Sequence, residues 1–268
     1  MCNYSAETQQ KAKELRIIDD ALFRLVASKD GVCQEILRTL LDDDELEVIS
    51  VTPQAALTSI ERGVILDALC KLSDGTYCNI EMQKTDKKND VKRVRFHASI
   101  ITASKTPKNT DFNDIPTVKV LYITEYDALN NGQTVTHVSR CQKVADNYIP
   151  VDDGEDIIFA NTEIKDDTKH TELLQLFLEK DSFQSENYPK LSDAMHHFKN
   201  TEEGVNEMCA SIETYANDRA IDTAIIACID FNKTAEEAVS YVGKKFPEVD
   251  NDKIISRVTF LWNQKKGE

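Results

Sequence analysis

The sequence contains no apolar run long enough to cross a membrane. Hydrophobic residues make up 41% of its 268 residues, but the longest apolar stretches, such as residues 224–229, fall far short of the ~18 residues that a transmembrane helix needs. Residues 1–10 lack the basic start and the apolar segment of a secretory signal. We therefore expect a globular protein without a membrane span, with one large or two modest domains.

The seven cysteines form no C-x-x-C pair. An odd number of thiols without that spacing argues against a disulfide framework and against a zinc site, and favours a cytoplasmic location. The G-x-x-x-x-G-K-[ST], G-x-S-x-G and H-E-x-x-H patterns are also missing. The sequence therefore lacks the usual signatures of P-loop nucleotide hydrolases, α/β-hydrolases and zinc metalloproteases.

Basic residues are in the minority. The chain has 47 Asp and Glu residues against 32 Lys and Arg residues, which gives a formal net charge of −15. Because nucleic-acid-binding proteins usually carry basic surfaces, this charge argues at first against such a partner. The acidity is uneven, however, since residues 151–268 carry −12, residues 1–150 carry −3, and residues 84–108 carry +6. The overall charge therefore does not exclude a nucleic-acid partner of the N-terminal half.

Hydrophobic periodicity divides the chain into an α/β part and a helical part. In the first part we expect helices at about 6–28, 32–42 and 90–105, and strands at 46–51, 64–71, 76–84, 117–124, 133–138 and 156–164. In the second part we expect helices at about 170–180, 190–199, 202–231, 235–246 and 251–264. The predicted organisation is an α/β domain of residues 1–165 followed by a helical C-terminal region of residues 166–268.

Two carboxylates interrupt predicted apolar strands. Asp67 and Glu81 each have an apolar neighbour on both sides, and a carboxylate in such surroundings is costly unless it is paired or bound to a cation. A three-residue loop at 73–75, with Gly75 in the left-handed conformation, would place the two acids directly opposite each other, with Gln83 on the same face. A two-residue Asp-Gly turn would put them on opposite faces.

The chemistry of this pair depends on that register. Two facing carboxylates beside an amide form an oxygen site suited to Mg²⁺ or Mn²⁺. The alternative is that both acids lie on a solvated face or at an edge of the sheet. Because only the facing arrangement gives a metal site, the three-residue loop is the prediction that separates the two interpretations.

Basic residues follow Glu81 closely along the chain. Lys84, Lys87 and Lys88 lie in the predicted loop, and Arg93 and Arg95 lie on the helix after it. As a group they are suited to phosphate contact, which neutralises the backbone and releases counterions. The alternative is a solvated loop and helix face. The expected buried stripe of the helix consists of Val91, Val94, Ala98 and Ile101.

The spacing of these residues resembles a known signature. Asp67 followed by Glu81-Met82-Gln83 is similar to the D-x(n)-(D/E)-x-(K/Q) pattern of the PD-(D/E)XK nuclease superfamily. A closer resemblance is to the recombination-promoting nuclease family, whose members are also described as PD-(D/E)XK family transposases. It rests on residues 65–67, 74–76, 79–83 and 93–99, on the helical segments 20–24 and 36–41, and on the strand at 118–125. It covers about residues 15–165, and the C-terminal helices only loosely.

The resemblance implies a restriction-endonuclease-like α/β fold, with a mixed central sheet flanked by helices. It also implies that Asp67 and Glu81 bind a catalytic Mg²⁺ or Mn²⁺, helped by the backbone carbonyl of Met82. Gln83 then occupies the place of the superfamily's lysine, where an amide orients the attacking water but supplies no positive charge. An acid from an early helix often completes such sites, and Glu35 is the candidate for it.

The leading hypothesis is a metal-dependent DNA endonuclease that hydrolyses phosphodiester bonds, linked to recombination or mobile elements. One alternative is a catalytically inactive nuclease-fold protein that acts through protein or DNA binding, with its acidic C-terminal helices on a protein partner. Another is hydrolysis of a different phosphoester. Double-strand cleavage would favour a symmetric homodimer with one site per strand.

Overall fold

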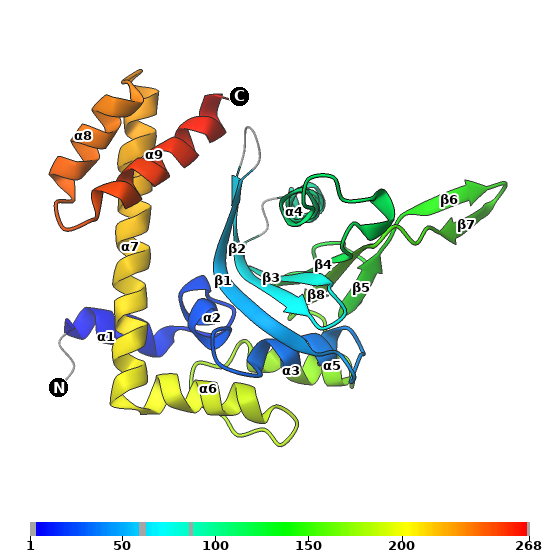
Figure 1. The fold of residues 1–268 in the computed structure, drawn as a ribbon. Helices are drawn as coiled ribbons and strands as arrows, with labels where there is room; N and C mark the ends of the chain where they lie inside the picture. Colours follow the sequence, from blue (N-terminus) through cyan, green and yellow to red (C-terminus); the bar gives the residue numbers. More distant parts are fainter. Residues whose placement is uncertain (1–3, 59–62, 86–87, 267–268) are drawn as a thin grey trace.

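The computed structural model describes residues 4–58, 63–85 and 88–266. Its centre is a six-stranded sheet in the order β1-β2-β3-β4-β8-β5, with a separate β6-β7 hairpin (Figure 1). Strands β3, β4 and β8 run parallel, whereas the other neighbours pair antiparallel. The predicted mixed sheet is therefore confirmed. The strands are β1 (Val48–Thr58), β2 (Gly63–Leu72), β3 (Tyr77–Gln83), β4 (Val118–Thr124), β5 (Val135–Val138), β6 (Cys141–Val144), β7 (Asn147–Pro150) and β8 (Glu155–Asn161).

Helices flank this sheet, and the chain after it is helical, as the sequence predicts. Helix α4 lies on one face of the sheet, and α2, α3 and α5 lie on the other (Figure 1). None of the helices in the described ranges combines the length and the apolar composition that a membrane crossing requires. The helices are α1 (Ala6–Glu14), α2 (Asp20–Val26), α3 (Val32–Leu40), α4 (Asp90–Lys105), the 3₁₀ turn η1 (Phe112–Asp114), α5 (Lys169–Leu176), α6 (Pro189–Asn200), α7 (Glu202–Asp230), α8 (Ala235–Lys245) and α9 (Asn251–Lys266).

The sheet separates two apolar clusters. On one face Ile80 belongs to a cluster that also contains Leu37 of α3, Phe177 after α5 and Met208 of α7. On the other face strand residues pack against α4, for instance through Val94. Because the first cluster joins residues from both sides of position 165, the sheet and the first helices after it share one core.

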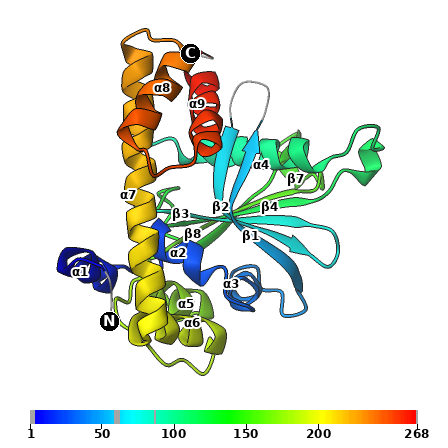
Figure 2. The ribbon, with the colours of Figure 1, turned by 60° about the vertical axis from the view of Figure 1, so that its left-hand side comes forward.

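Helix α7 extends beyond this core. Its second half forms a third apolar cluster with α8 and α9. Ile225 of α7, Val242 of α8 and Val258 of α9 belong to this cluster. The side chain of Arg257 on α9 donates to Asp222 on α7 at 2.6 Å, which ties the two helices together. Figure 2 shows α7 running alongside α2 and the sheet, with α8 and α9 against its upper half.

Strand β1 continues through Pro53, where the sequence pattern predicted its end. Proline cannot donate a ladder hydrogen bond, but β1 is an edge strand of the sheet, where this is tolerated. The next residue, Gln54, has a φ of 52°, a left-handed conformation that non-glycine residues adopt rarely. In the β1–β2 register Gln54 falls opposite Asp67. The backbone distortion of this edge strand is therefore adjacent to one of the two carboxylates.

The β6–β7 hairpin was not predicted. It projects away from the rest of the molecule (Figure 1), and each of its strands has four exposed residues. A strand exposed on both faces needs no alternation of apolar and polar residues. The periodicity that identifies a half-buried strand is therefore missing here.

Candidate active site

The loop between β2 and β3 has three residues, as predicted. The backbone N–H of Leu72 donates to the carbonyl of Thr76 at 2.8 Å, and the N–H of Gly75 donates back to Leu72 at 3.1 Å. Gly75 has a φ of 92°, which glycine adopts without strain. The carboxylate of Asp74 accepts the backbone N–H of Thr76 at 2.9 Å. Local turn chemistry therefore fixes the register of the hairpin.

This register places Asp67 opposite Glu81. The β2–β3 ladder ends at the pair Ala68 and Ile80, and the two acids are the next residues along. Beyond the last ladder pair, side chains of the two acids contact the backbone of the neighbouring strand. Oδ2 of Asp67 accepts the backbone N–H of Met82 at 2.9 Å, and Oε2 of Glu81 lies 3.5 Å from the backbone nitrogen of Asp67. The predicted three-residue loop and its register are thus confirmed, and this register puts the two carboxylates at neighbouring positions of β2 and β3.

Glu81 is buried, with an exposed fraction of 1%, and polar groups surround its carboxylate. Nη2 of Arg93 lies 3.1 Å from Oε1, the side-chain amide of Asn79 donates to Oε2 at 3.2 Å, and Nδ1 of His97 lies 3.7 Å from Oε2. Burial raises the pKa of Glu81, while Arg93 and Asn79 oppose this effect. The carboxylate is thus held by groups on two elements, β3 and α4.

Asp67 lies close to two other acids. Burial, followed by the neighbouring Glu81 and then Asp20, raises the pKa of Asp67 well above its ordinary range. Asp20 is the first residue of α2, and burial raises its pKa as well, against the effect of Arg24 and Arg93. Carboxylates that crowd together in this way repel one another unless a cation lies between them. Without a bound cation, these surroundings therefore favour the neutral form of Asp67.

A buried contact positions Arg93. Oδ1 of Asp90, the first residue of α4, accepts the hydroxyl of Tyr122 on β4 at 2.7 Å and that of Tyr126 at 3.0 Å. These bonds fix the first turn of α4 against the sheet. Arg93 follows three residues later, so the same anchor holds its guanidinium beside Glu81.

The buried face of α4 differs in part from the prediction. Val94, Ala98 and Ile101 are buried as expected, but Val91 is 54% exposed and His97 is buried instead. His97 shares a face with Arg93, as their spacing predicts, and this face turns towards Glu81. A polar contact with the buried carboxylate therefore replaces one of the expected apolar contacts.

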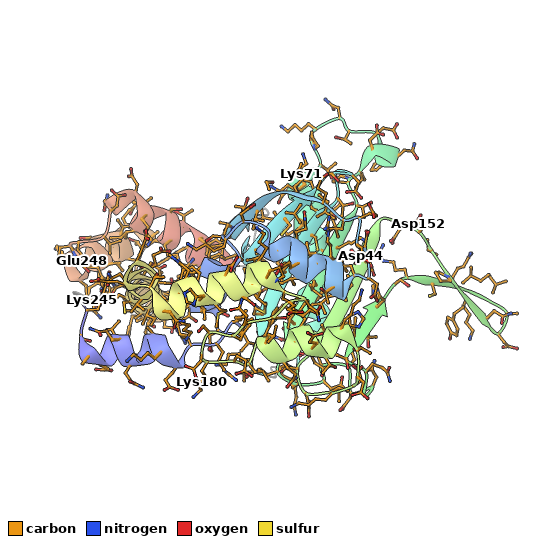
Figure 3. The ribbon with its side chains drawn as sticks, turned by 90° about the horizontal axis from the view of Figure 1, so that it is seen from below. Asp44, Lys71, Asp152, Lys180, Lys245 and Glu248 are labelled. Atoms are coloured by element: carbon orange, nitrogen blue, oxygen red, sulfur yellow. The ribbon has the colours of Figure 1, made fainter. Side chains whose placement is uncertain are left out.

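The carboxylates lie in a cleft of about 1170 Å³. Residues of β2 and β3 line it together with residues of α1, α2, α7 and α9, so the helices after position 165 contribute to the same cleft. Figure 3 labels Lys180 near α1, where it pairs with Glu14 at the rim. The basic lining residues are Lys11, Arg16, Arg24, Lys84, Arg93, Lys180, Arg219 and Arg257; the acidic ones are Glu14, Asp19, Asp20, Asp67, Glu81, Asp218 and Asp222.

The structure brings most of the predicted residues into this cleft. Asp67, Glu81, Met82, Gln83, Lys84 and Arg93 all line it. The side-chain amide of Gln83 donates to the backbone carbonyl of Thr85 at 2.7 Å, and Lys84 pairs with Asp19. Lys88 and Arg95 are exposed and do not line the cleft. Lys87 lies outside the described residues.

Glu35 is not brought to the cleft. Its two carboxylate oxygens accept the backbone N–H groups of Lys190 and Leu191, at 2.8 and 2.9 Å, and so cap the start of α6. Asp20, from another early helix, lines the cleft instead and acts electrostatically on Asp67. The sequence signal for Asp20 was weak, because an acid in the first turn of a helix is also the ordinary complement to the helix dipole.

The wall that α7 contributes was not identified from the sequence. It includes Tyr215, Asp218, Arg219 and Asp222. A signal was present, since Tyr215 and Arg219 are four residues apart and share a face of the helix. Which way that face points depends on how α7 docks, which the local pattern does not specify.

Comparison with known proteins agrees with this geometry. The family model described as PD-(D/E)XK nuclease family transposase matches residues 19–257, a range that includes the sheet, the facing carboxylates and α7. No curated protein and no solved structure matches the chain. The matched range extends well beyond residues 15–165, so the C-terminal helices are part of the family pattern. With its facing carboxylates on a β-hairpin of a mixed sheet, this chain belongs to the PD-(D/E)XK nuclease family transposases.

Proposed function

We propose that the protein is a metal-dependent endodeoxyribonuclease that hydrolyses phosphodiester bonds of DNA. The observation that carries the proposal is the pair Asp67 and Glu81, which lie on adjacent strands in a cleft lined by both basic and acidic side chains. Membership of a nuclease and transposase family implies a DNA substrate. The recombination or transposition role of the family is part of the same proposal.

The residues present fit a hard divalent cation. Within the described ranges, no group of three or more His, Cys, Asp or Glu side chains is arranged to hold a metal ion. Mg²⁺ does not need such a cage, because it commonly binds through one or two carboxylates and keeps several water ligands. Asp67 and Glu81 would hold it, with the backbone carbonyl of Met82, and their mutual repulsion supports a cation there. Bound in this way, Mg²⁺ or Mn²⁺ supplies an activated water and neutralises charge that develops at phosphorus.

Gln83 would orient the attacking water. It lies on the same face of β3 as Glu81, two residues further along the strand, and lines the cleft. Its amide can donate to and accept from a water molecule, but it brings no positive charge to the transition state. We therefore propose that the cationic contribution, which a lysine gives elsewhere in the superfamily, comes here from Arg93.

Arg93 and Lys84 would contact the substrate phosphates. Both line the cleft, and the side chain of Arg93 is 32% exposed while one of its nitrogens touches Glu81. A guanidinium in this position can bind a phosphate in a bidentate manner. Outside the cleft, phosphates of the duplex or of the flanking strand would then be contacted by Lys87, Lys88 and Arg95.

Asp20 is the third acid of the proposed site. It begins α2, lines the cleft and acts electrostatically on Asp67. We propose that its carboxylate would receive the proton of the attacking water. In this role it replaces Glu35, whose carboxylate caps α6.

A plasmid-nicking assay tests the proposal. The full-length protein is incubated with supercoiled plasmid and Mg²⁺, Mn²⁺ or EDTA, beside Asp67→Asn, Glu81→Gln and the matched control Glu45→Gln, whose side chain is exposed and outside the cleft. We expect metal-dependent nicking by the wild type and the control, and a loss of at least 10²-fold in the first two variants. Absence of nicking, or equal nicking by Asp67→Asn, would contradict the proposal.

One observation favours a second candidate function. Arg93 already compensates the charge of Glu81, and Gln83 donates its amide to Thr85. An inactive nuclease-fold protein that binds DNA without cutting it is compatible with these contacts. The nicking assay separates the two, because the inactive protein retains binding to DNA at every metal concentration but produces no open-circle plasmid.

A further inference from the structure

We propose that Tyr215 on α7 is a stacking platform for an unpaired nucleobase, and that the cleft accepts a single-stranded stretch of DNA beside the carboxylates. This inference rests on the proposed function and names the form of its substrate. It is drawn from the surroundings of Tyr215, from two arginines beside its ring, and from the path that connects them to Asp67.

Tyr215 is not part of the apolar core. It lines the cleft and is half-buried, yet it belongs to none of the three apolar clusters, whereas Ile212, one turn earlier on the same helix, packs against the first of them. An aromatic side chain that faces a cleft without apolar packing contributes little to the fold. Its ring instead faces the polar cleft, beside charged side chains.

Two guanidinium groups flank its ring. The Cζ atoms of Arg24 on α2 and Arg219 on α7 lie 5.2 and 5.8 Å from the ring centroid of Tyr215. The other basic residues of the cleft form ion pairs with carboxylates. Among the described residues of the cleft, Arg24 and Arg219 are the basic ones that form no such ion pair. Their charge is therefore available to the phosphates of a bound strand.

The platform shares one cleft with the carboxylates. Nε of Arg24 donates to the backbone carbonyl of Asp20 at 3.3 Å, and Asp20 lines this cleft together with Asp67. All four residues, Tyr215 included, line one cleft. A strand with a phosphate at Asp67 would thus lead towards Arg24, with a base in reach of Tyr215.

This chemistry selects an unpaired strand. In a duplex the faces of the bases are stacked on one another, and only their edges are open to protein in the grooves. An aromatic ring can stack on a base only where the strand is single or locally unpaired, and arginine beside an aromatic ring strengthens such sites. Tyr215 with its two guanidiniums therefore fits single-stranded DNA and contributes nothing to the binding of an intact duplex.

The size of the cleft agrees with a strand rather than a single nucleotide. Pockets for drug-sized ligands span roughly 300–1,000 Å³, and this cleft is larger, at about 1170 Å³. Walls from α1 and α2, from α7 and α9, and from the strand ends of β2 and β3 surround it. A run of several unpaired nucleotides has room there.

Fluorescence anisotropy tests the proposal. Labelled single-stranded dT20 and a 20-base-pair duplex are titrated in EDTA with full-length Asp67→Asn protein, which we expect to fold and to leave the probe uncut. Tyr215→Ala is added in this background, beside Tyr215→Phe and the matched control Tyr241→Ala. Tyr241 also lies near a basic residue, Lys245, but on α8 and outside the cleft.

We expect Tyr215→Ala to weaken binding of dT20 by about 5- to 150-fold. Binding of the duplex should change less than about 2-fold, because a duplex offers no base face. Tyr215→Phe and Tyr241→Ala should bind dT20 as the parent does. Equal losses on both probes, or no loss on dT20, would overturn the proposal.

A second readout reports the stacking itself. A dT20 strand with one 2-aminopurine should lose fluorescence on binding when the base stacks on Tyr215, and Tyr215→Ala should abolish that quenching at saturating protein. Unchanged quenching in the variant would contradict the platform. If quenching does not depend on Tyr215 but the protein nicks plasmid, only the stacking proposal is overturned. If binding depends on Tyr215 but no nicking occurs, only the proposed nuclease activity is overturned.

Discussion

Nη2 of Arg93 lies 3.1 Å from Oε1 of Glu81, so a basic side chain contacts one of the two carboxylates that we propose as metal ligands. Both Arg93 and a divalent cation would be attracted to the same oxygen. A cation at Glu81 would weaken this ion pair and free the guanidinium for a phosphate in the cleft. Metal binding and phosphate binding are therefore expected to support each other.

Replacing Arg93 with alanine should separate these two effects. The Arg93→Ala variant should bind Mn²⁺ more tightly than the wild type, by about 3- to 10-fold, because the competing cation is removed. Its rate of plasmid cleavage should nevertheless fall by about 10²–10³-fold, since a charge that contacts the phosphate is lost. Isothermal titration calorimetry and the nicking assay measure the two quantities. Arg95→Ala, on an exposed position of the same helix, is the control, and weaker metal binding by Arg93→Ala would count against this account.

Asp67→Asn should make the metal-free protein more stable at neutral pH. Burial and Glu81 raise the pKa of Asp67 above its unfolded value. Such a group supports folding below the ordinary carboxyl pKa of about 4, and this support is lost as the pH rises towards the raised folded pKa. In EDTA the variant should therefore melt at a higher temperature than the wild type at pH 8, with a gap that narrows towards pH 5. Asp146→Asn, at an exposed site, should show no such gap, and a lower melting temperature of Asp67→Asn at pH 8 would be inconsistent with this explanation.

Asp20 and Glu35 should respond in opposite ways. Asp20→Asn should lower cleavage by about 10-fold or more and leave the fold intact, because Asp20 acts on Asp67 in the cleft. Glu35→Gln should cleave DNA normally but lose roughly 0.5–2 kcal/mol of unfolding free energy, because it caps α6. Urea denaturation and the nicking assay on both variants provide the comparison. If Glu35→Gln were the one that lost activity, our assignment of the third acid would be wrong.

Gly75→Ala tests the loop that fixes the register. A Cβ atom at this position meets no atom within 4 Å, so any effect comes from the φ of 92° alone. A left-handed alanine costs about 1–2 kcal/mol, which should appear as a lower midpoint in urea denaturation. Gly75→Asn should lose less, since asparagine tolerates this region better. Equal stability of Gly75→Ala and the wild type would show that the loop tolerates another conformation.

The parts of the site that follow from local chemistry were predictable from the sequence. Gly75 and Asp74 specify a three-residue loop, and strand alternation then places Asp67 and Glu81 opposite each other. The long helix at 202–231 was also predictable, because its length and composition are helical on their own. These features depend on residues that are close in the chain.

The parts that depend on packing between distant elements were not predictable. Glu35 and Asp20 both lie on early helices, and which of them reaches the cleft depends on how α2 and α3 dock on the sheet. Tyr215 reaches the cleft because α7 packs along α2, more than 100 residues after the strands that carry the carboxylates. Pro53 predicted the end of a strand, but β1 lies at the sheet edge, where proline is tolerated.

The most direct test of the central claim is the position of a bound metal. A crystal of the full-length protein grown with Mn²⁺ should show one anomalous peak between the side chains of Asp67 and Glu81, at roughly 2.0–2.6 Å from an oxygen of each. The peak should disappear in Asp67→Asn crystals grown in the same way. The account would be contradicted if the Mn²⁺ peak lay elsewhere, or if no peak appeared between Asp67 and Glu81 and Arg93 stayed in contact with Glu81.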